Sequence, residues 1–212
     1  MKASKKIVDL GCGNHPVPGA TAAVDLYIEP AERSLGKGPT INVQKLEEKG
    51  LAFVNRRIDS PLPFADKEFD FAYSHHAFEH FDDPAAACEE TMRIAKSGVI
   101  ITPTICAELL FGRPYHRWLV MDRNNTIFFF RKRRFEDRPF GNHPGWDNNR
   151  NQWIVEKDTN AFDILLNDGN WYHGKERLPR LAAILKKYWR SHAPVMEVIF
   201  MWEGRFEYKV YE

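Results

Sequence analysis

The sequence has 212 residues, of which 43% are hydrophobic and 28% are charged, and its net charge is +1. This composition is typical of a globular chain that is large enough for one substantial core. The near-neutral charge gives no global attraction to nucleic acid or to an anionic membrane surface. No stretch reaches the length of a membrane span and the N-terminus lacks the apolar core of a signal peptide, so we expect a cytoplasmic protein. Three widely spaced cysteines indicate neither a disulfide framework nor a zinc cluster.

The most informative segment lies near the N-terminus and combines two short strands with a glycine turn. Residues 7–10 supply the apolar run of a buried strand, and Gly11 and Gly13 allow a sharp turn that brings backbone N–H groups close to a ligand. Residues 22–24 form a second apolar run, and Asp25 follows at the place where a carboxylate can bind both hydroxyls of a ribose. The segment therefore predicts a site for a nucleoside-containing cofactor.

Two classes of cofactor compete for such a turn. A dinucleotide site needs a third glycine where the helix packs on the strand, and here His15 and Pro16 follow the second glycine instead. The pattern Asp-Leu-Gly-Cys-Gly, followed by a strand that ends in aspartate, resembles the cofactor-binding segment of class I S-adenosylmethionine-dependent methyltransferases. In that family the turn passes under the methionine part of the cofactor and the acid binds the ribose. The resemblance implies cofactor contacts from Asp9, Gly11, Cys12, Gly13, Asp25 and Leu26.

A second segment, residues 58–84, carries the same resemblance. Asp59 stands where the family places the acid that meets the adenine amino group, and a Leu-Pro-Phe turn follows at residues 62–64. The run at residues 69–74 is similar to the family's fourth strand, which leads into the active-site loop. The resemblance covers about residues 5–103. It implies further cofactor contacts from Asp59, Ser60, Ser74 and His75.

The resemblance implies an α/β fold: a doubly wound, Rossmann-like, mostly parallel seven-stranded sheet with a C-terminal antiparallel hairpin and a substrate-side insertion after strand five. The residue pattern favours the same fold. Asp83 and Pro84 predict the start of a helix that Gly98 is expected to end, and residues 99–102 predict the next buried strand. Toward the C-terminus the pattern predicts an amphipathic helix at residues 178–189 and a hairpin formed by residues 195–202 and 205–211.

We expect residues 1–212 to form a single domain in which residues 104–176 are the insertion that binds the substrate. This segment is much longer than a crossover needs, and it holds four of the six tryptophans. Long aromatic and polar segments on a compact scaffold are usually functional, although these aromatic residues could instead form a satellite core. Tyr115, Arg117 and Trp118 combine two aromatic faces with a fixed cation, so they are candidate contacts for a polar ring-shaped or anionic substrate.

Residues 124–134 predict an additional strand that ends in a basic cluster, Arg131 to Arg134. With its adjoining aromatic residues, this cluster is the best local indication of nucleic-acid binding. Nearby acidic residues and the neutral overall charge favour a solvated edge, or a site for a phosphate or carboxylate of a small substrate.

Methyl transfer from S-adenosylmethionine requires an acceptor in line with the sulfonium and, for a hydroxyl or a protonated amine, a base. A histidine that titrates near neutrality suits this role. His116 is the first candidate, and His80 or His76 is the second, because both lie in the loop after the fourth strand. No spacing of His, Asp or Asn in the insertion indicates a set of metal ligands, so no metal is expected.

The sequence thus predicts an S-adenosylmethionine-dependent methyltransferase that acts on a small polar acceptor, such as a sugar, a glycan precursor or a secondary metabolite, at oxygen or nitrogen. Neither a membrane nor a nucleic-acid partner is expected, and no oligomeric state is indicated. One alternative is a methyltransferase-like binding or regulatory protein that transfers no methyl group. Another is an RNA methyltransferase that uses the basic cluster. The missing third glycine disfavours a nicotinamide-dependent oxidoreductase.

Overall fold

The computed structural model describes residues 5–26, 41–105, 107–108, 116–131, 146–147, 152–153, 187 and 191–212. Its elements, in chain order, are β1 (Ile7–Leu10), β2 (Ala22–Asp25), α1 (Val43–Glu47), β3 (Ala52–Asn55), β4 (Phe71–His75), the short 3₁₀ helix η1 (Phe78–His80), α2 (Pro84–Ile94), β5 (Ser97–Pro103), β6 (Trp118–Arg123), β7 (Thr126–Arg131), β8 (Trp146–Asp147), β9 (Gln152–Trp153), α7 (Ala193–Met196), β10 (Glu197–Glu203) and β11 (Glu207–Tyr211).

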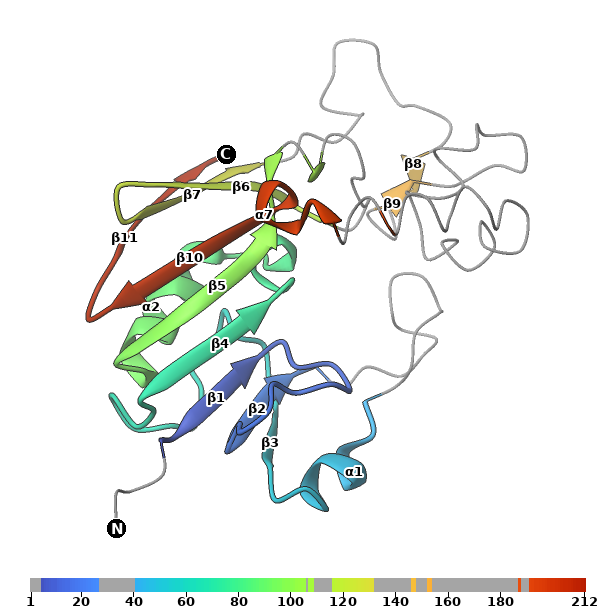
Figure 1. Cartoon of the computed structure of the whole chain (residues 1–212), viewed down its shortest axis with the longest axis vertical. Coiled ribbons are helices and arrows are strands. Elements are labelled where there is room, and N and C mark those ends of the chain that lie inside the picture. Colours follow the sequence, from blue (N-terminus) through green and yellow to red (C-terminus); the bar gives the residue numbers. More distant parts are fainter. Residues whose placement is uncertain are drawn as a thin grey trace.

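The larger sheet has the strand order β10-β5-β4-β1-β2-β3, and Figure 1 shows these six strands side by side. Every neighbouring pair is parallel except β10 and β5, which are antiparallel. The central strands are buried on both faces, as expected of a parallel sheet; Val8, Leu10 and Val24 are fully covered. The predicted mostly parallel sheet is confirmed, and among the described residues it has six strands where seven were predicted.

A second sheet of three strands has the order β11-β7-β6. The predicted C-terminal hairpin is wrong. The chain leaves the larger sheet after the turn at Gly204, and β11 pairs in parallel with β7 instead of with β10. Figure 1 shows β10 and β11 diverging from this turn. In its observed place β11 packs Tyr208 and Val210 against the main core, and its contacts reach α2.

Helix α2 begins where the sequence predicts and ends earlier. The Asp83 carboxylate accepts a hydrogen bond from the Ala86 N–H at 2.9 Å, which is an N-cap. The helix stops at Ile94, so the prediction that Gly98 ends it is wrong. Gly98 lies inside β5 instead, where a Cβ would come within 2.4 Å of the Ala72 carbonyl oxygen.

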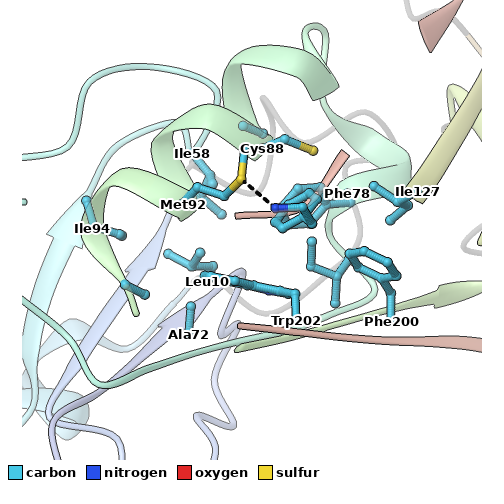
Figure 2. Packing of buried hydrophobic residues seen from close by; sticks show 14 of the residues in the cluster. Leu10, Ile58, Ala72, Phe78, Cys88, Met92, Ile94, Ile127, Phe200 and Trp202 are labelled. Atoms are coloured by element: carbon cyan, nitrogen blue, oxygen red, sulfur yellow. Dashed lines mark hydrogen bonds between the residues drawn. The ribbon is translucent and has the colours of Figure 1, made fainter. Parts of the chain in front are cut away.

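The main core lies between one face of the larger sheet, α2 and the second sheet. In Figure 2, Leu10 and Trp202 from the larger sheet face Met92 of α2, and Ile127 of β7 borders the same cluster. The dashed line marks the Phe206 N–H, which donates to the Met92 sulfur at 3.3 Å. A smaller cluster lies on the other face and comprises Cys12, Ala23, Ile41, Leu46 and Leu51.

Part of the sequence prediction lies outside the described residues. This applies to the helix predicted at residues 178–189, apart from residue 187, and to most of the insertion at residues 104–176. The additional strand predicted from residue 124 is confirmed as β7, which ends at Arg131. Among the described helices, none has the length and apolarity that a bilayer crossing requires.

Candidate active site

Three strand ends meet at one edge of the larger sheet. Leu10, the last residue of β1, pairs with Val24 of β2 on one side and with Ser74 of β4 on the other. The residues that follow these strands are therefore neighbours in space, although they are far apart in the sequence. This carboxyl edge is where open α/β sheets bind their ligands.

Gly11 begins the turn after β1 and touches the loop after β4. Its N–H donates to the Val24 carbonyl at 2.8 Å, and its φ is +87°. A Cβ at this position would lie 2.5 Å from the Ala77 Cβ. Only glycine combines this conformation with this approach, so the cofactor turn predicted from the sequence packs directly against the segment that leads into η1.

Gly13 and Asp25 form the centre of the predicted cofactor site. The Gly13 N–H donates to Asp25 Oδ2 at 2.7 Å, and the Leu26 N–H donates to Asp25 Oδ1 at 2.7 Å. Gly13 has a φ of +52°, and a Cβ added to it would meet no atom within 4 Å. Two backbone amides thus orient the carboxylate at the end of β2, while the turn beside it borders open space.

The buried side chains of Asp9 and Cys12 pack next to the glycine turn. Asp9 is buried, and its Oδ2 accepts a hydrogen bond from the Val17 N–H at 2.6 Å. Burial raises the pKa of Asp9 to about 6, and the neighbouring Asp25 acts in the same direction. Burial, together with the two carboxylates, raises the pKa of Cys12 to about 12, so this cysteine remains a thiol and packs as a small turn residue.

Asp59 is bound within the protein. Its carboxylate accepts two hydrogen bonds from the Arg57 guanidinium at 2.9 and 2.6 Å, and two from the Asp82 and Asp83 N–H groups at 3.1 and 3.2 Å. Burial raises its pKa, but these donors outweigh burial and lower it below the ordinary value. In this arrangement Asp59 ties the loop after β3 to the start of α2, and its contact with adenine remains a prediction. Ser60 donates to the Arg57 carbonyl at 2.6 Å.

The two predicted cofactor residues at the end of β4 have different surroundings. Ser74 is buried, and its hydroxyl donates to the Leu10 carbonyl at 2.8 Å, so it connects β4 to β1. His75 is partly exposed and lies 3.6 Å from Glu197. The direct cofactor contact stays a prediction for both residues, and the burial of Ser74 makes its side chain the less accessible of the two.

The three histidines predicted as candidate bases come together around one carboxylate, that of Glu79 in η1. Glu79 Oε1 lies 3.5 Å from His76 Nδ1, 3.8 Å from His80 Nε2 and 3.9 Å from His116 Nε2. Glu79 is 1% exposed, and burial raises its pKa to about 8, with the charge of Glu108 acting in the same direction. The structure thus gathers these histidines from two distant segments.

Two further carboxylates hold this histidine cluster. Glu108 Oε2 lies 2.7 Å from His116 Nδ1, and both side chains are buried. Glu197, at the start of β10, lies 3.4 Å from His76 Nε2. Burial, followed by the neighbouring His75, lowers the pKa of His76 to about 4, so its imidazole is neutral near pH 7.

The predicted substrate-binding residues are only partly available to a substrate. Trp118 is 2% exposed and its indole N–H donates to the Phe81 carbonyl at 2.7 Å, so it packs in the core, which does not favour the predicted substrate contact. Arg117 pairs with Asp82 at 2.5 Å, and its exposed fraction is 36%. Tyr115 lies outside the described residues.

Sequence reasoning missed the carboxylates of this site: Glu79, Glu108 and Glu197. A partial signal existed for Glu79, since Phe78 and Phe81 flank it and three histidines lie within four residues of it. No local signal marks Glu108 or Glu197, because their histidine partners are distant in the sequence or belong to another strand.

The strand order defines a Rossmann-like fold, and the glycine turn and Asp25 form a candidate site at its carboxyl edge. Residues 8–102 match the model of the methyltransferase domain family, which confirms the resemblance to class I S-adenosylmethionine-dependent methyltransferases. An uncharacterised methyltransferase of Schizosaccharomyces pombe is 29% identical over a match of 113 residues, and the match covers 46% of this chain and 38% of that protein. The chain thus matches less than half the length of this relative.

Two solved structures are similar to about half of the chain. The YcgJ protein of Bacillus subtilis is 24% identical, with a TM-score of 0.38, and the match covers 48% of this chain and 45% of that one. Geranyl diphosphate C-methyltransferase of Streptomyces coelicolor, solved with Mg²⁺, geranyl diphosphate and S-adenosylhomocysteine, is 17% identical with a TM-score of 0.36, covering 47% and 40% of the two chains.

Proposed function

We propose that the protein transfers the methyl group of S-adenosylmethionine to a small polar acceptor, at oxygen or nitrogen. The observation that carries this proposal is the arrangement of Gly13 and Asp25: a carboxylate fixed by two backbone amides beside a glycine that borders open space. A carboxylate in this position suits the two hydroxyls of a ribose. The methyltransferase domain match over residues 8–102 supports the choice of cofactor.

Different residues of the carboxyl edge would bind different parts of the cofactor. Asp25 would hold the ribose, and the backbone of Gly11 and Gly13 would line the methionine part of the cofactor. When bound, S-adenosylmethionine supplies an electrophilic methyl group on a sulfonium. The protein then has to hold the acceptor in line with that methyl group and remove its proton.

His76 is the histidine that we assign to proton removal. Its side chain is 31% exposed, so an acceptor can reach the ring, and its Nδ1 lies 3.5 Å from the Glu79 carboxylate. It is also next to Ala77, which touches Gly11 of the cofactor turn. His116, the first candidate from the sequence, is 8% exposed and fixed against Glu108, which makes it less accessible to an acceptor.

Calorimetric titration with S-adenosylhomocysteine tests the cofactor site. We expect Asp25→Ala and Gly13→Ala to weaken binding at least about tenfold, equivalent to about 1.4 kcal/mol. Gly50→Ala is the matched control. Gly50 also has a positive φ, and a Cβ added to it would meet no atom within 4 Å, but it precedes the amino end of β3, away from the carboxyl edge of the sheet. Both glycine variants carry similar backbone strain, of about 1–2 kcal/mol. Absence of binding to the wild type, or equal loss in both glycine variants, would refute the assignment.

Transfer of a labelled methyl group from S-adenosylmethionine separates the proposal from its alternatives. We expect the label in a fraction of small polar metabolites and none in RNA. In the described part of the basic cluster, Arg131 pairs with Glu212 at 2.7 Å, which does not favour RNA binding. Cofactor binding without transfer to any fraction would instead support a binding or regulatory protein.

A further inference from the structure

Glu79 is a buried carboxylate in the part of the chain that the structure describes. It lies in η1 beside the buried Phe78, and neither of its oxygens has a hydrogen-bond partner among the described residues. Burying a carboxylate in this way is costly unless a cation or a set of donors compensates it. The methyl-transfer proposal gives Glu79 no role that accounts for this cost.

Two imidazole nitrogens lie near the same carboxylate, slightly farther from it than ligands that share a metal ion. His80 Nε2 and His116 Nε2 lie 3.8 and 3.9 Å from Glu79 Oε1, and the donor atoms of the three residues all lie within 4.8 Å of one another. In a tetrahedral site with metal–ligand distances of about 2.0–2.2 Å, neighbouring ligand atoms are about 3.3–3.6 Å apart. Small side-chain rotations would therefore close the three donors around an ion.

The second nitrogen of His116 is already held as a metal-binding histidine requires. Its Nδ1 lies 2.7 Å from Glu108 Oε2, and an N–H at Nδ1 that donates to this carboxylate leaves the lone pair at Nε2, facing Glu79. A carboxylate that orients a histidine in this way is a recurrent feature around bound zinc. Glu108 is thus a positioning residue for the cluster.

We propose that Glu79, His80 and His116 bind one divalent transition-metal ion of the Zn²⁺ class. Imidazole nitrogens favour such ions over Mg²⁺, and one carboxylate completes a set of three protein ligands. The fourth position would be open on the side of Glu79 that faces His76, 3.5 Å away. An acceptor bound there through oxygen would be polarised by the ion. The proposal depends on this geometry alone and does not require methyl transfer.

A second group of donors lies nearby and has to be distinguished from this site. His75, His76 and Glu197 are also mutually close, but the His75 side chain is 46% exposed and the group contains no orphaned carboxylate. We therefore assign the ion to the buried cluster, and variants of the two clusters decide between them.

The test is a titration of tag-free, chelator-treated full-length protein with Zn²⁺ by calorimetry, and with Co²⁺ by visible absorption. We expect one Zn²⁺ per chain, the d–d absorption of low-coordinate Co²⁺, and no comparable binding of Mg²⁺. Glu79→Gln and His116→Gln should weaken Zn²⁺ binding more than about 100-fold, and Glu108→Gln by about 10–100-fold. Glu197→Gln and the exposed His192→Ala should bind as the wild type does.

Thermal unfolding in the presence and absence of Zn²⁺ gives a second readout. Zn²⁺ should raise the midpoint of the wild type and leave that of Glu79→Gln unchanged, while Glu79→Gln without metal should be at least as stable as the metal-free wild type. If Glu79→Gln or His116→Gln fails to fold, His80→Ala, at a 35% exposed side chain, replaces it. The proposal is overturned if the wild type shows no saturable 1:1 binding, if the Glu79 or His80 variant binds normally, or if only Glu197→Gln loses the ion.

Discussion

The residue after β4 has a backbone conformation that is costly outside glycine. His76 has a φ of +55°, and its N–H donates to the Ile101 carbonyl at 2.8 Å. The left-handed region costs about 1–2 kcal/mol for a residue with a side chain. Such conformations persist where the surrounding structure enforces them, often at functional sites. Here the conformation places the ring between Glu79 and Glu197.

His76→Asn tests the role of this ring with little disturbance of the backbone, because asparagine tolerates the left-handed region. Loss of a general base typically lowers the rate about 10²–10⁴-fold, so we expect kcat to fall by that factor. The affinity for S-adenosylhomocysteine should stay within about twofold, or about 0.4 kcal/mol, of the wild type. Steady-state kinetics with the acceptor fraction, together with calorimetry, measures both. Unchanged kcat would remove His76 from the mechanism.

Asp9 makes the stability of the protein depend on pH. Its pKa is raised from 3.8 to about 6, so the folded state binds the proton more tightly than the unfolded state does. The stability that protonated Asp9 gives the folded state is fully present below about pH 4 and is lost as the pH rises through about 6. At 1.36 kcal/mol per pKa unit, ionised Asp9 costs about 3 kcal/mol at neutral pH.

Asp9→Asn removes this titration, and its amide oxygen can still accept from the Val17 N–H. We expect the variant to be more stable than the wild type by up to about 3 kcal/mol at neutral pH, and about equal to it near pH 4. Urea unfolding at the two pH values measures the difference. A constant difference between the two proteins across this range would show that Asp9 does not titrate there.

At the scale of elements, Gly98 fixes how closely β4 and β5 approach each other. A Cβ there would lie 2.4 Å from the Ala72 carbonyl oxygen and 2.9 Å from the Trp202 ring. We expect Gly98→Ala to cost about 1–3 kcal/mol, the usual range for overpacking, or more if the strand pairing is distorted. Its affinity for S-adenosylhomocysteine should be unchanged, because Gly98 lies at the start of β5, away from the carboxyl edge. Normal stability, or loss of affinity alone, would contradict this account.

The elements that the sequence predicted correctly are those that depend on residues close together in the chain. The apolar runs of β1 and β2 and the cap at Asp83 depend on side chains within a few residues of each other, and the structure confirms them. The prediction for Gly98 was wrong because the sequence does not distinguish a glycine that ends a helix from a glycine that packs closely inside a strand. The burial that distinguishes them comes from Trp202, more than one hundred residues away.

The same limit explains what could be predicted of the candidate site. The glycine turn and Asp25 follow from their neighbours in the sequence, and the histidines were candidates by residue type alone. Their common centre at Glu79 could not be predicted, because His116 comes from a segment that begins after β5 and is held there by Glu108. The partner of β11 was equally hidden: a Glu-Gly turn marks a change of direction and does not specify which strand is met next.

At the scale of the whole molecule, Phe206 joins the larger sheet, α2 and the second sheet. Its ring centroid lies 5.1 Å from that of Phe200 and 5.3 Å from that of Trp202, both on β10. Its N–H donates to the Met92 sulfur of α2 at 3.3 Å, and β11 begins at the next residue. The buried ring therefore lies where the chain passes from one sheet to the other.

Phe206→Ala should weaken the whole molecule because three elements share this contact. Removal of a buried phenylalanine typically costs about 3–5 kcal/mol, a large part of the stability of a domain of this size. Since both sheets pack into one continuous core, we expect a single unfolding transition that moves to lower urea concentration. Far-ultraviolet circular dichroism and tryptophan fluorescence should report the same midpoint. Two separate transitions would mean that the second sheet unfolds on its own, and that Phe206 joins two independent units rather than one core.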